Sequence, residues 1–499
     1  MSLTQLSTRA QEGMNAPEVN VEVHISNGLP AFTIVGLPEA AVREARDRVR
    51  SAIINSGFEF PARRITVNLA PADLPKEGGR YDLAIALGIL AASSQINAAS
   101  LNQFDCYGEL ALSGECRPVT GLLPALISSK KQNKKVIIPQ KNETEASLIE
   151  GLAIFTSHSL AQICSSLNGG YPLPQLEASD FRYTPQFECD LDEVYGQYEA
   201  RRALEIAASG SHHMLMMGPP GTGKSMLAQR LNTILPLMSE TEAMSSASVR
   251  SISHKPVNAA NWLQRPFQSP HHTVSGVALV GGGSNPKPGE ISLAHNGVLF
   301  LDELTEFDRK SIEVLREPLE TGKIHISRAA RQAEFPAQFQ LVAAMNPCPR
   351  GCDSIMNCDC SAEQLNRYRN KLSAPLMDRI DIQIELPRLE SHELLNRKQV
   401  KQEASGIVRM RVTQTRTRQL ERQDCLNARL TNHQIDAFCQ LDASSEKILM
   451  TAIDKLKLTA RSYHKLLKLA RTIADMVDEK NIQQMHLLEA ISYRQQDKR

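Results

Sequence analysis

The chain has 499 residues, of which 42% are hydrophobic and 22% charged, and its formal net charge is +1. This length exceeds what one hydrophobic core sustains, so we expect two or three domains, and the composition excludes a disordered or collagen-like protein. The nearly balanced charge excludes nucleic-acid binding through a global field, so any such contact must come from local basic patches.

Targeting segments and disulfides are not expected from the sequence. The first residues, MSLTQLSTRAQEG, lack the pattern of a signal peptide, and no run of eighteen apolar residues could span a membrane. Ten cysteines in a chain of this length are too few for a disulfide scaffold. We therefore expect a cytoplasmic protein with no membrane partner.

Residues 1–165 alternate strand-like runs with helical patterns. VNVEVHI, FTIVG, RITVNLA and KKVIIP have the apolar or alternating character of strands, whereas EAAVREARDRVRSAIINSG and YDLAIALGILAAS have helical spacing. This alternation predicts an α/β domain.

The rest of the chain divides into three parts. Residues 166–190 are rich in Gly, Pro and Ser and predict a linker. Residues 191–390 alternate helices with the apolar runs HMLMMG, GVLFLDE and FQLVAAMN, which predicts a largely parallel sheet whose strand ends share one edge. Residues 391–499 have helical spacing almost throughout and predict a helical C-terminal domain.

A phosphate-binding motif follows the first central run. Its spacing, GxxxxGK[ST], lies between an apolar strand and an amphipathic helix. In such a loop the backbone N–H groups wrap phosphates, Lys224 reaches the β- and γ-phosphates, and Ser225 ligates Mg²⁺. We expect ATP and Mg²⁺ to bind this loop, which consists of Gly218, Pro219, Pro220, Gly221, Thr222, Gly223, Lys224 and Ser225.

Polar side chains end the next two central runs. GVLFLDE ends in Asp302, which can hold Mg²⁺ through water, and Glu303, which can orient the attacking water. FQLVAAMN ends in Asn346, which can bridge the γ-phosphate and that water. The alternative for Asn346 is a role in starting the turn before Pro347.

Two arginines are further candidates for neutralising transition-state charge. Arg379 lies in SAPLMDRID and Arg461 in LTARSYHKLL. If Arg379 lies on the far side of the sheet from the phosphate loop, it can serve only a neighbouring subunit, and the protein must then be an oligomer. A surface ion pair is the alternative for each arginine.

Four of the ten cysteines fall within thirteen residues. They are Cys348, Cys352, Cys358 and Cys360, and their spacing C-x3-C-x5-C-x-C can enclose one tetrahedral Zn²⁺ of structural type. Free thiols in a loop are the alternative. Catalytic zinc is not expected because no hydrolytic histidine constellation lies beside the cluster, and His271 and His272 need not be ligands.

Longer segments carry a resemblance to a known family. These segments are DEVYGQYEARRALEIAA, RPFQSPHHTVSGVALVGGGSNPKPGEISLAHNGVLFLDEL, LVAAMNPCPRG, APLMDRIDI and ARSYHKLLKLARTIADM. With them, nearly the whole chain resembles the magnesium-chelatase-like branch of AAA+ ATPases, and within that branch the YifB/ComM group.

This resemblance implies a P-loop ATPase core with a helical C-terminal lid, assembled as a hexameric ring around single-stranded or branched DNA. It also implies an ATP-dependent helicase that drives branch migration of recombination intermediates during natural transformation, with recombination proteins as further partners. It makes Arg379 a finger acting in trans and Arg461 the lid sensor. The adenine pocket is then lined by Val194, Tyr195, Gly196 and Gln197.

The N-terminal domain resembles a Lon-protease-like fold, but its catalytic dyad is missing. Arg80 stands at the position of the nucleophile and Leu123 at that of the lysine. We therefore expect no peptidase activity.

Three basic segments are candidates for DNA contact. Arg328 and Arg331 lie at the tip of a predicted hairpin before the Asn346 strand, and by resemblance this hairpin points into the pore. Lys287 lies on the Pro-flanked tip of a hairpin that resembles an insertion of this branch. The run at 409–422 has five arginines on a predicted helix. A solvated surface is the alternative for all three.

Two other functions remain open at the level of sequence. One is an ATP-driven remodeller of a protein partner, like a chelatase subunit. The other is a nucleotide-gated DNA-binding scaffold, which would keep the phosphate loop but need not use Glu303. ATP turnover that rises when DNA is added is expected of a DNA motor, and its measurement therefore separates a motor from these two functions.

Overall fold

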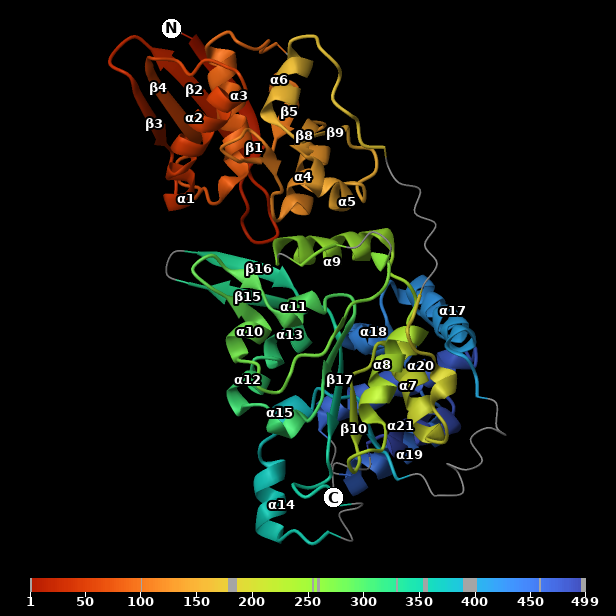
Figure 1. The fold of residues 1–499 in the computed structure, drawn as a ribbon. Coiled ribbons are helices and arrows are strands. Elements are labelled where there is room, and N and C mark those ends of the chain that lie inside the picture. Colours follow the sequence, from red (N-terminus) through yellow and green to blue (C-terminus); the bar gives the residue numbers. More distant parts are fainter. Residues whose placement is uncertain are drawn as a thin grey trace.

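The computed structural model describes residues 2–99, 101–177, 186–253, 255–257, 261–328, 331–352, 358–388, 402–456 and 459–494. We call residues 2–177 the N-terminal unit, 186–388 the central unit and 402–494 the C-terminal unit. The N-terminal unit lies above the central unit, and the helices of the C-terminal unit pack beside it (Figure 1).

The N-terminal unit is built on a mixed seven-stranded sheet. Its order is β3-β4-β2-β1-β5-β8-β9, and β2 alternates buried and partly exposed side chains, which is the pattern of a strand with one covered face. The larger strands are β1 (Ser2–Arg9), β2 (Glu18–Ser26), β3 (Ala31–Val35), β4 (Arg64–Ala70), β5 (Phe104–Cys106), β8 (Lys135–Pro139) and β9 (Ile154–Ser157), and a small ribbon joins β6 (Glu109–Leu110) to β7 (Cys116–Arg117).

Helices of this unit form where the sequence predicts them. The predicted helix YDLAIALGILAAS becomes α3, whose residues are all buried, and it packs on β1 and β2. The predicted helix beginning at residue 39 is interrupted at Glu44 and forms two pieces. The helices are α1 (Ala40–Arg43), α2 (Ala45–Asn55), α3 (Asp82–Ala92), α4 (Leu122–Lys131), α5 (Glu143–Ala146) and α6 (Leu160–Leu167).

The central unit contains a five-stranded sheet in which every pairing is parallel. The three predicted runs form β10, β14 and β17, and their almost complete burial is typical of strands covered on both faces. Two shorter edge strands complete the sheet. Its order is β11 (Phe267–Gln268), β14 (Val298–Leu301), β17 (Gln340–Met345), β10 (Met214–Met217) and β18 (Ile382–Glu385).

Two hairpins and several helices surround this sheet. Both hairpins predicted from the sequence are present: β12 (Gly281–Gly282) with β13 (Lys287–Pro288), and β15 (Lys323–Ser327) with β16 (Gln332–Pro336). The helices are α7 (Tyr198–Gly210), α8 (Lys224–Ile234), α9 (Glu240–Ile252), α10 (Gly276–Val280), α11 (Glu290–Leu293), α12 (Arg309–Glu313), α13 (Arg316–Thr321), α14 (Ala362–Arg369) and α15 (Ala374–Met377).

The C-terminal unit is helical in its described residues, as predicted. Its helices share a core with one face of the central sheet, where Val412 and Leu466 cluster with Met214 and Met216 of β10. Leu215, between these two methionines, joins the core on the opposite face of the sheet. The helices are α17 (Ser405–Gln423), α18 (Asn432–Phe438), α19 (Ala443–Leu456), α20 (Ala460–Met476) and α21 (Gln484–Ser492).

The first part of the predicted linker is attached to the N-terminal unit. The Thr156 N–H donates to the Pro174 carbonyl at 3.0 Å, and the Leu176 N–H donates to the Ile154 carbonyl at 2.8 Å. Residues 178–185 of the predicted linker lie outside the described residues. No helix among the described residues has the length and apolar character needed to cross a membrane.

Candidate functional site

The GxxxxGK[ST] loop connects the end of β10 to the first residue of α8. Gly221 and Gly223 adopt φ values of +81° and +89°, which favour glycine. The Lys224 Nζ donates to the carbonyls of Gly218 at 2.6 Å and Pro219 at 2.9 Å. Burial lowers the pKa of Lys224, while the negative charges of Asp302 and Glu303 oppose that shift. The loop therefore presents a cation and the N-terminus of α8 at the same edge of the sheet.

The acidic pair lies where β14 ends, beside this loop. The Ser225 Oγ donates to Asp302 Oδ2 at 2.5 Å, so the two expected Mg²⁺ ligands are adjacent. Glu303 adopts φ +52°, which turns the chain after Asp302. Its Oε2 lies 3.1 Å from the Nδ1 of His272, a contact that the sequence did not predict.

Asn346 follows β17, the strand between β14 and β10. Its Oδ1 accepts from the Lys224 Nζ at 3.2 Å. The Asn346 carbonyl accepts from the hydroxyl of Tyr368 at 3.2 Å, and this hydroxyl in turn accepts from Thr305 at 2.8 Å. The backbone before Pro347 is therefore fixed by α14, while the amide side chain points toward the phosphate loop.

Residues 194–197 precede α7 and are connected to the start of the phosphate loop by the residues that follow β18. The Gln197 Nε2 donates to the Pro387 carbonyl at 2.8 Å, and the Leu386 N–H donates to the Met217 carbonyl at 2.7 Å. Val194 is buried in the core, and its carbonyl accepts from Arg201 at 2.8 Å. The segment assigned to the adenine pocket is thus connected to the beginning of the phosphate loop.

Arg379 and Arg461 are brought together, and the residue that unites them is Glu320 of α13. The Oε1 of Glu320 lies 2.5 Å from Arg379 Nη2 and 2.6 Å from Arg461 Nη2. All three line a cavity of about 730 Å³, together with Lys465 and Lys468, and none of residues 218–225 lines it. The Nε of Arg379 is buried without a hydrogen-bond partner. This cavity gathers cations away from the chain's own phosphate loop.

The two hairpins place their basic residues differently. Arg328 and Arg331 close the β15–β16 turn, where the Arg328 N–H donates to the Arg331 carbonyl at 2.8 Å. Arg328 is exposed, but Arg331 forms ion pairs with Glu39 and Glu77 of the N-terminal unit. The prediction that Lys287 lies at a tip was wrong by one position, because Lys287 pairs with Gly282 within β13.

The five arginines at 409–422 lie on α17, as predicted, but they make internal contacts. Arg416 is buried and donates to the Ala208 carbonyl at 2.8 Å. The others hold α17 against neighbouring elements: Arg409 donates to the Thr233 carbonyl, Arg411 pairs with Glu205 and Glu403, Arg418 with Asp478, and Arg422 with Asp475. These contacts favour a packing role over a DNA-tracking surface.

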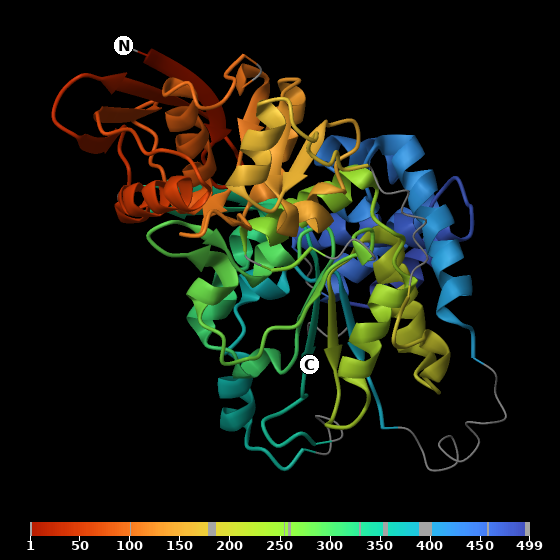
Figure 2. The same ribbon diagram turned by 45° about the horizontal axis from the view of Figure 1, so that its top comes forward.

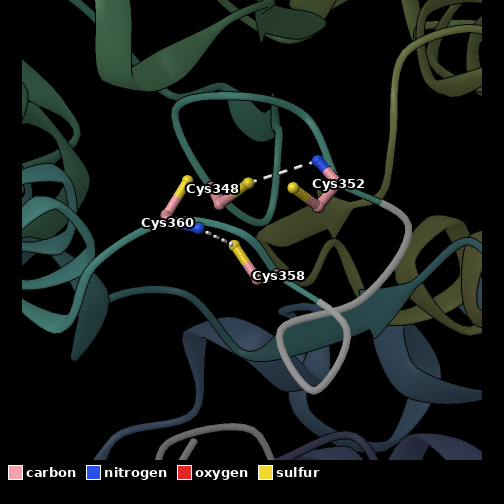
Figure 3. A group of neighbouring side chains, drawn as sticks. All are labelled: Cys348, Cys352, Cys358 and Cys360. Atoms are coloured by element: carbon pink, nitrogen blue, oxygen red, sulfur yellow. Dashed lines mark hydrogen bonds between the residues drawn. The ribbon is translucent and has the colours of Figure 1, made fainter.

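The four clustered cysteines converge in one loop after Asn346 (Figure 3). Their Sγ atoms all lie within 4.8 Å of one another, and all four are free thiols. The Cys352 N–H donates to Cys348 Sγ at 3.2 Å, and the Cys360 N–H donates to Cys358 Sγ at 3.4 Å. Four thiolates bound to one Zn²⁺ lie about 2.3 Å from the metal and about 3.8 Å from each other, so this donor set fits the ion.

The same loop contacts the phosphate loop. Gly351 has φ +68°, and a Cβ added there would lie 2.8 Å from the Cδ of Pro220. Backbone of the cysteine loop therefore approaches the phosphate loop more closely than any residue with a side chain would allow. The two loops are therefore in direct contact at Gly351 and Pro220.

The two positions of the missing dyad have structural surroundings. Arg80 is 6% exposed and donates to Gln11 Oε1 at 3.2 Å and to the Thr120 carbonyl. Leu123, in the first turn of α4, is fully buried in the core of the N-terminal unit. Neither side chain offers a nucleophile or an activating amine.

Comparisons with known proteins match all three units. The family described as magnesium chelatase, subunit ChlI, matches residues 190–394; related descriptions, subunit ChlI of Mg-chelatase and its C-terminal part, match 21–142 and 402–494. The chain is 50% identical over 498 residues to competence protein ComM of Haemophilus influenzae, covering 99% of this chain and 98% of that protein. It is 49% identical over 498 residues to YifB of Escherichia coli, covering 100% and 98%.

A more distant likeness is confined to part of the chain. The magnesium-chelatase 38 kDa subunit of Cereibacter sphaeroides is 25% identical over 173 residues, which cover 31% of this chain and 51% of that protein.

Proposed function

The chain belongs to the ComM/YifB group of magnesium-chelatase-like AAA+ proteins, and from that premise we propose that it is an ATP-driven DNA helicase. Its role would be branch migration of recombination intermediates during natural transformation, since a full-length relative is named a competence protein. The observation that carries the ATPase part is the convergence of Lys224, Asp302 and Asn346 at one edge of a parallel sheet.

The residues at this edge divide the work of ATP hydrolysis. The loop of Gly218–Ser225 would hold the phosphates through its N–H groups and Lys224, and Ser225 with Asp302 would hold Mg²⁺, which neutralises phosphate charge when bound. Glu303 would orient the attacking water, and Asn346 would position it against the γ-phosphate. His272 contacts Glu303 and would fix the direction in which its carboxylate points.

The arrangement of Arg379 and Arg461 supports an oligomer, which we propose to be a hexameric ring. Both arginines share the carboxylate of Glu320 in a cavity that excludes their own phosphate loop. Two guanidinium groups around one carboxylate are suited to a bidentate anion such as a phosphate. We infer that this cavity faces the nucleotide of a neighbouring subunit, where Arg379 acts as the finger and Arg461 as the sensor.

For the DNA contact we propose the tip of the β15–β16 hairpin. Replacing Arg328 and Arg331 together by alanine should weaken binding of single-stranded and forked DNA for every sequence, because phosphate contacts rather than base contacts are lost. Loss of two such contacts should flatten the slope of log affinity against log salt by about 1.4 per hairpin. Unwinding should fall further than binding, since hydrolysis without grip on the strand produces slippage.

The measurement is fork affinity and fork unwinding over a salt series. The matched control replaces Arg367 and Arg369 of α14, which also removes two arginines from one short element. If the salt slope and the unwinding are both unchanged in the hairpin variant, Arg328 and Arg331 do not bind DNA. Lys287 would then be the remaining candidate for the DNA contact.

We also propose that the cysteine loop holds one structural Zn²⁺. Elemental analysis should find about one zinc per chain, and Cys352→Ser should release it, because three thiolates bind zinc less well than four. ATP affinity should also fall in this variant, since Gly351 of the same loop packs on Pro220. Cys425→Ser, outside the cluster, is the control. A metal-free protein of equal stability, purified without chelators, would identify the four cysteines as ordinary thiols.

A further inference from the structure

The N-terminal unit covers the face of the central unit that carries both hairpins. Figures 1 and 2 show it lying over α9 and over the β15–β16 hairpin. Gly13 in the turn after β1 lies against Ala333 of β16, at 3.5 Å from its Cβ to the position of an added Cβ. The hairpins proposed to contact DNA therefore lie under the N-terminal unit. None of the nucleotide-site residues named above belongs to this unit.

Two kinds of contact hold the units together. Around α9 the contact combines apolar packing with hydrogen bonds: Ala247 joins the core of the N-terminal unit, and the Gly121 N–H donates to the Ser251 carbonyl at 3.0 Å. Ser251 also donates to Glu145 at 2.9 Å. Burial of this kind does not depend on salt and makes the α9 contact a fixed anchor.

At the hairpin tips the contact is ionic. Arg331 forms ion pairs with both Glu39 and Glu77, and Asn285 in the β12–β13 turn donates to Glu77. The Arg331 side chain is 18% exposed, against 46% for Glu39 and 27% for Glu77. Burial and the neighbouring Glu39 raise the pKa of Glu77, while the positive charge of Arg331 lowers it. One guanidinium is therefore held by two carboxylates of another unit.

The packing around Glu77 is loose enough for the ion pairs between Arg331 and the N-terminal unit to break. A cavity of about 350 Å³ remains between the N-terminal unit and the β12–β13 turn, and it is lined by Glu77, Arg80, Asn285 and Lys287 among others. A gap of this size lacks the close packing of a permanent interface, so the charges rather than buried apolar surface join the two sides here.

We propose that Glu39 and Glu77 form a latch that holds Arg331 against the N-terminal unit until the DNA backbone takes the arginine from them. This inference rests on the proposed DNA contact at the hairpin tip. Carboxylate and phosphate compete for the same guanidinium group, so Arg331 cannot serve both fully at once. The N-terminal unit, which lacks the peptidase dyad, then acts as an acidic gate on the strand-binding hairpin.

The test is a double-mutant cycle on DNA affinity. Glu39→Gln with Glu77→Gln keeps the size of both side chains and removes their charge, and Arg331→Ala removes the arginine. Affinity for single-stranded DNA is measured at low salt for the parent, the double glutamine variant, Arg331→Ala and the triple variant. The charge-matched control is Glu44→Gln with Glu59→Gln, which neutralises two exposed carboxylates elsewhere on the N-terminal unit.

The latch predicts that the double glutamine variant binds DNA about threefold to tenfold more tightly than the control pair, because partly exposed ion pairs are individually weak. In the Arg331→Ala background the same two substitutions should have no effect beyond that of the control pair. Equal tightening in both backgrounds would mean that only general charge repulsion was relieved, and unchanged affinity in both would mean that no competition exists; either result overturns the latch.

A second measurement does not depend on DNA. Hydrogen exchange of the backbone amides in β15 and β16 should accelerate in the double glutamine variant, since the tip loses its attachment, and should be unchanged in the control pair. If no variant binds DNA but the hairpin amides exchange faster in the double glutamine variant, the proposed function is wrong, while the attachment of the hairpin to Glu39 and Glu77 is confirmed. If the amides exchange at the parental rate, the latch is refuted whatever the DNA results.

Discussion

Lys224→Ala is expected to abolish ATP binding, whereas Glu303→Gln is expected to bind ATP and hydrolyse it at least about a hundredfold more slowly. The two effects differ because Lys224 lies inside the phosphate cradle, 2.6 Å from the Gly218 carbonyl, while Glu303 lies beyond it at the end of β14. Removing the Glu303 charge leaves the cradle and the Ser225–Asp302 contact intact.

Equilibrium binding of a fluorescent ATP analogue and the rate of phosphate release measure the two effects separately. Glu306→Gln is the control for Glu303, because it is an exposed carboxylate three residues further along that pairs only weakly with Lys371, at 3.4 Å. Lys310→Ala, which removes an exposed lysine, is the control for Lys224. Normal ATP turnover in either Lys224→Ala or Glu303→Gln would show that ATP is not hydrolysed at this edge of the sheet.

Arg379→Ala should reduce ATP turnover by about a thousandfold or more while leaving ATP affinity nearly unchanged, as expected for a finger that acts on the transition state. Its position explains why: Arg379 lines a cavity that contains none of its own phosphate-loop residues. Arg367→Ala, on the exposed face of α14, is the control, since its side chain is 81% exposed.

Mixing two inactive variants decides whether the finger acts between subunits. A subunit with Glu303→Gln still carries Arg379, and a subunit with Arg379→Ala still carries Glu303, so an interface between them can hold one complete site. Mixed rings should therefore regain turnover that neither variant has alone. If co-purified mixed rings stay as inactive as each variant alone, Arg379 works within its own chain, and the cavity does not face a neighbouring subunit's nucleotide.

The parts of the fold that the sequence predicted are those set by local pattern. The runs that became β10, β14 and β17 are apolar, end in polar residues and follow recognisable motifs, so their shared edge could be foreseen. The edge strand β11 has only two residues, and β18 is recognisable mainly through its parallel pairing with β10. Such pairing joins residues that are far apart in the sequence, so the local sequence pattern does not predict it.

The candidate site shows the same division. The phosphate loop, the acidic pair and Asn346 were predicted because each follows a strand in a fixed spacing. The contact of His272 with Glu303, and the role of Glu320 in joining two arginines, depend on tertiary packing. The arginines of α17 looked like a DNA surface because most of their partners lie far away in the sequence; Glu205, for example, lies 206 residues from Arg411.

Strand displacement on forked DNA by the purified full-length protein tests the proposed helicase function directly, with and without ATP and with Glu303→Gln in parallel. A DNA motor should displace the strand only when ATP is hydrolysed, so we expect displacement by the parent protein, none by Glu303→Gln, and ATP turnover that rises when DNA is added. ATP turnover that ignores DNA, together with no displacement of any fork, would contradict a DNA motor and favour a remodeller of a protein partner.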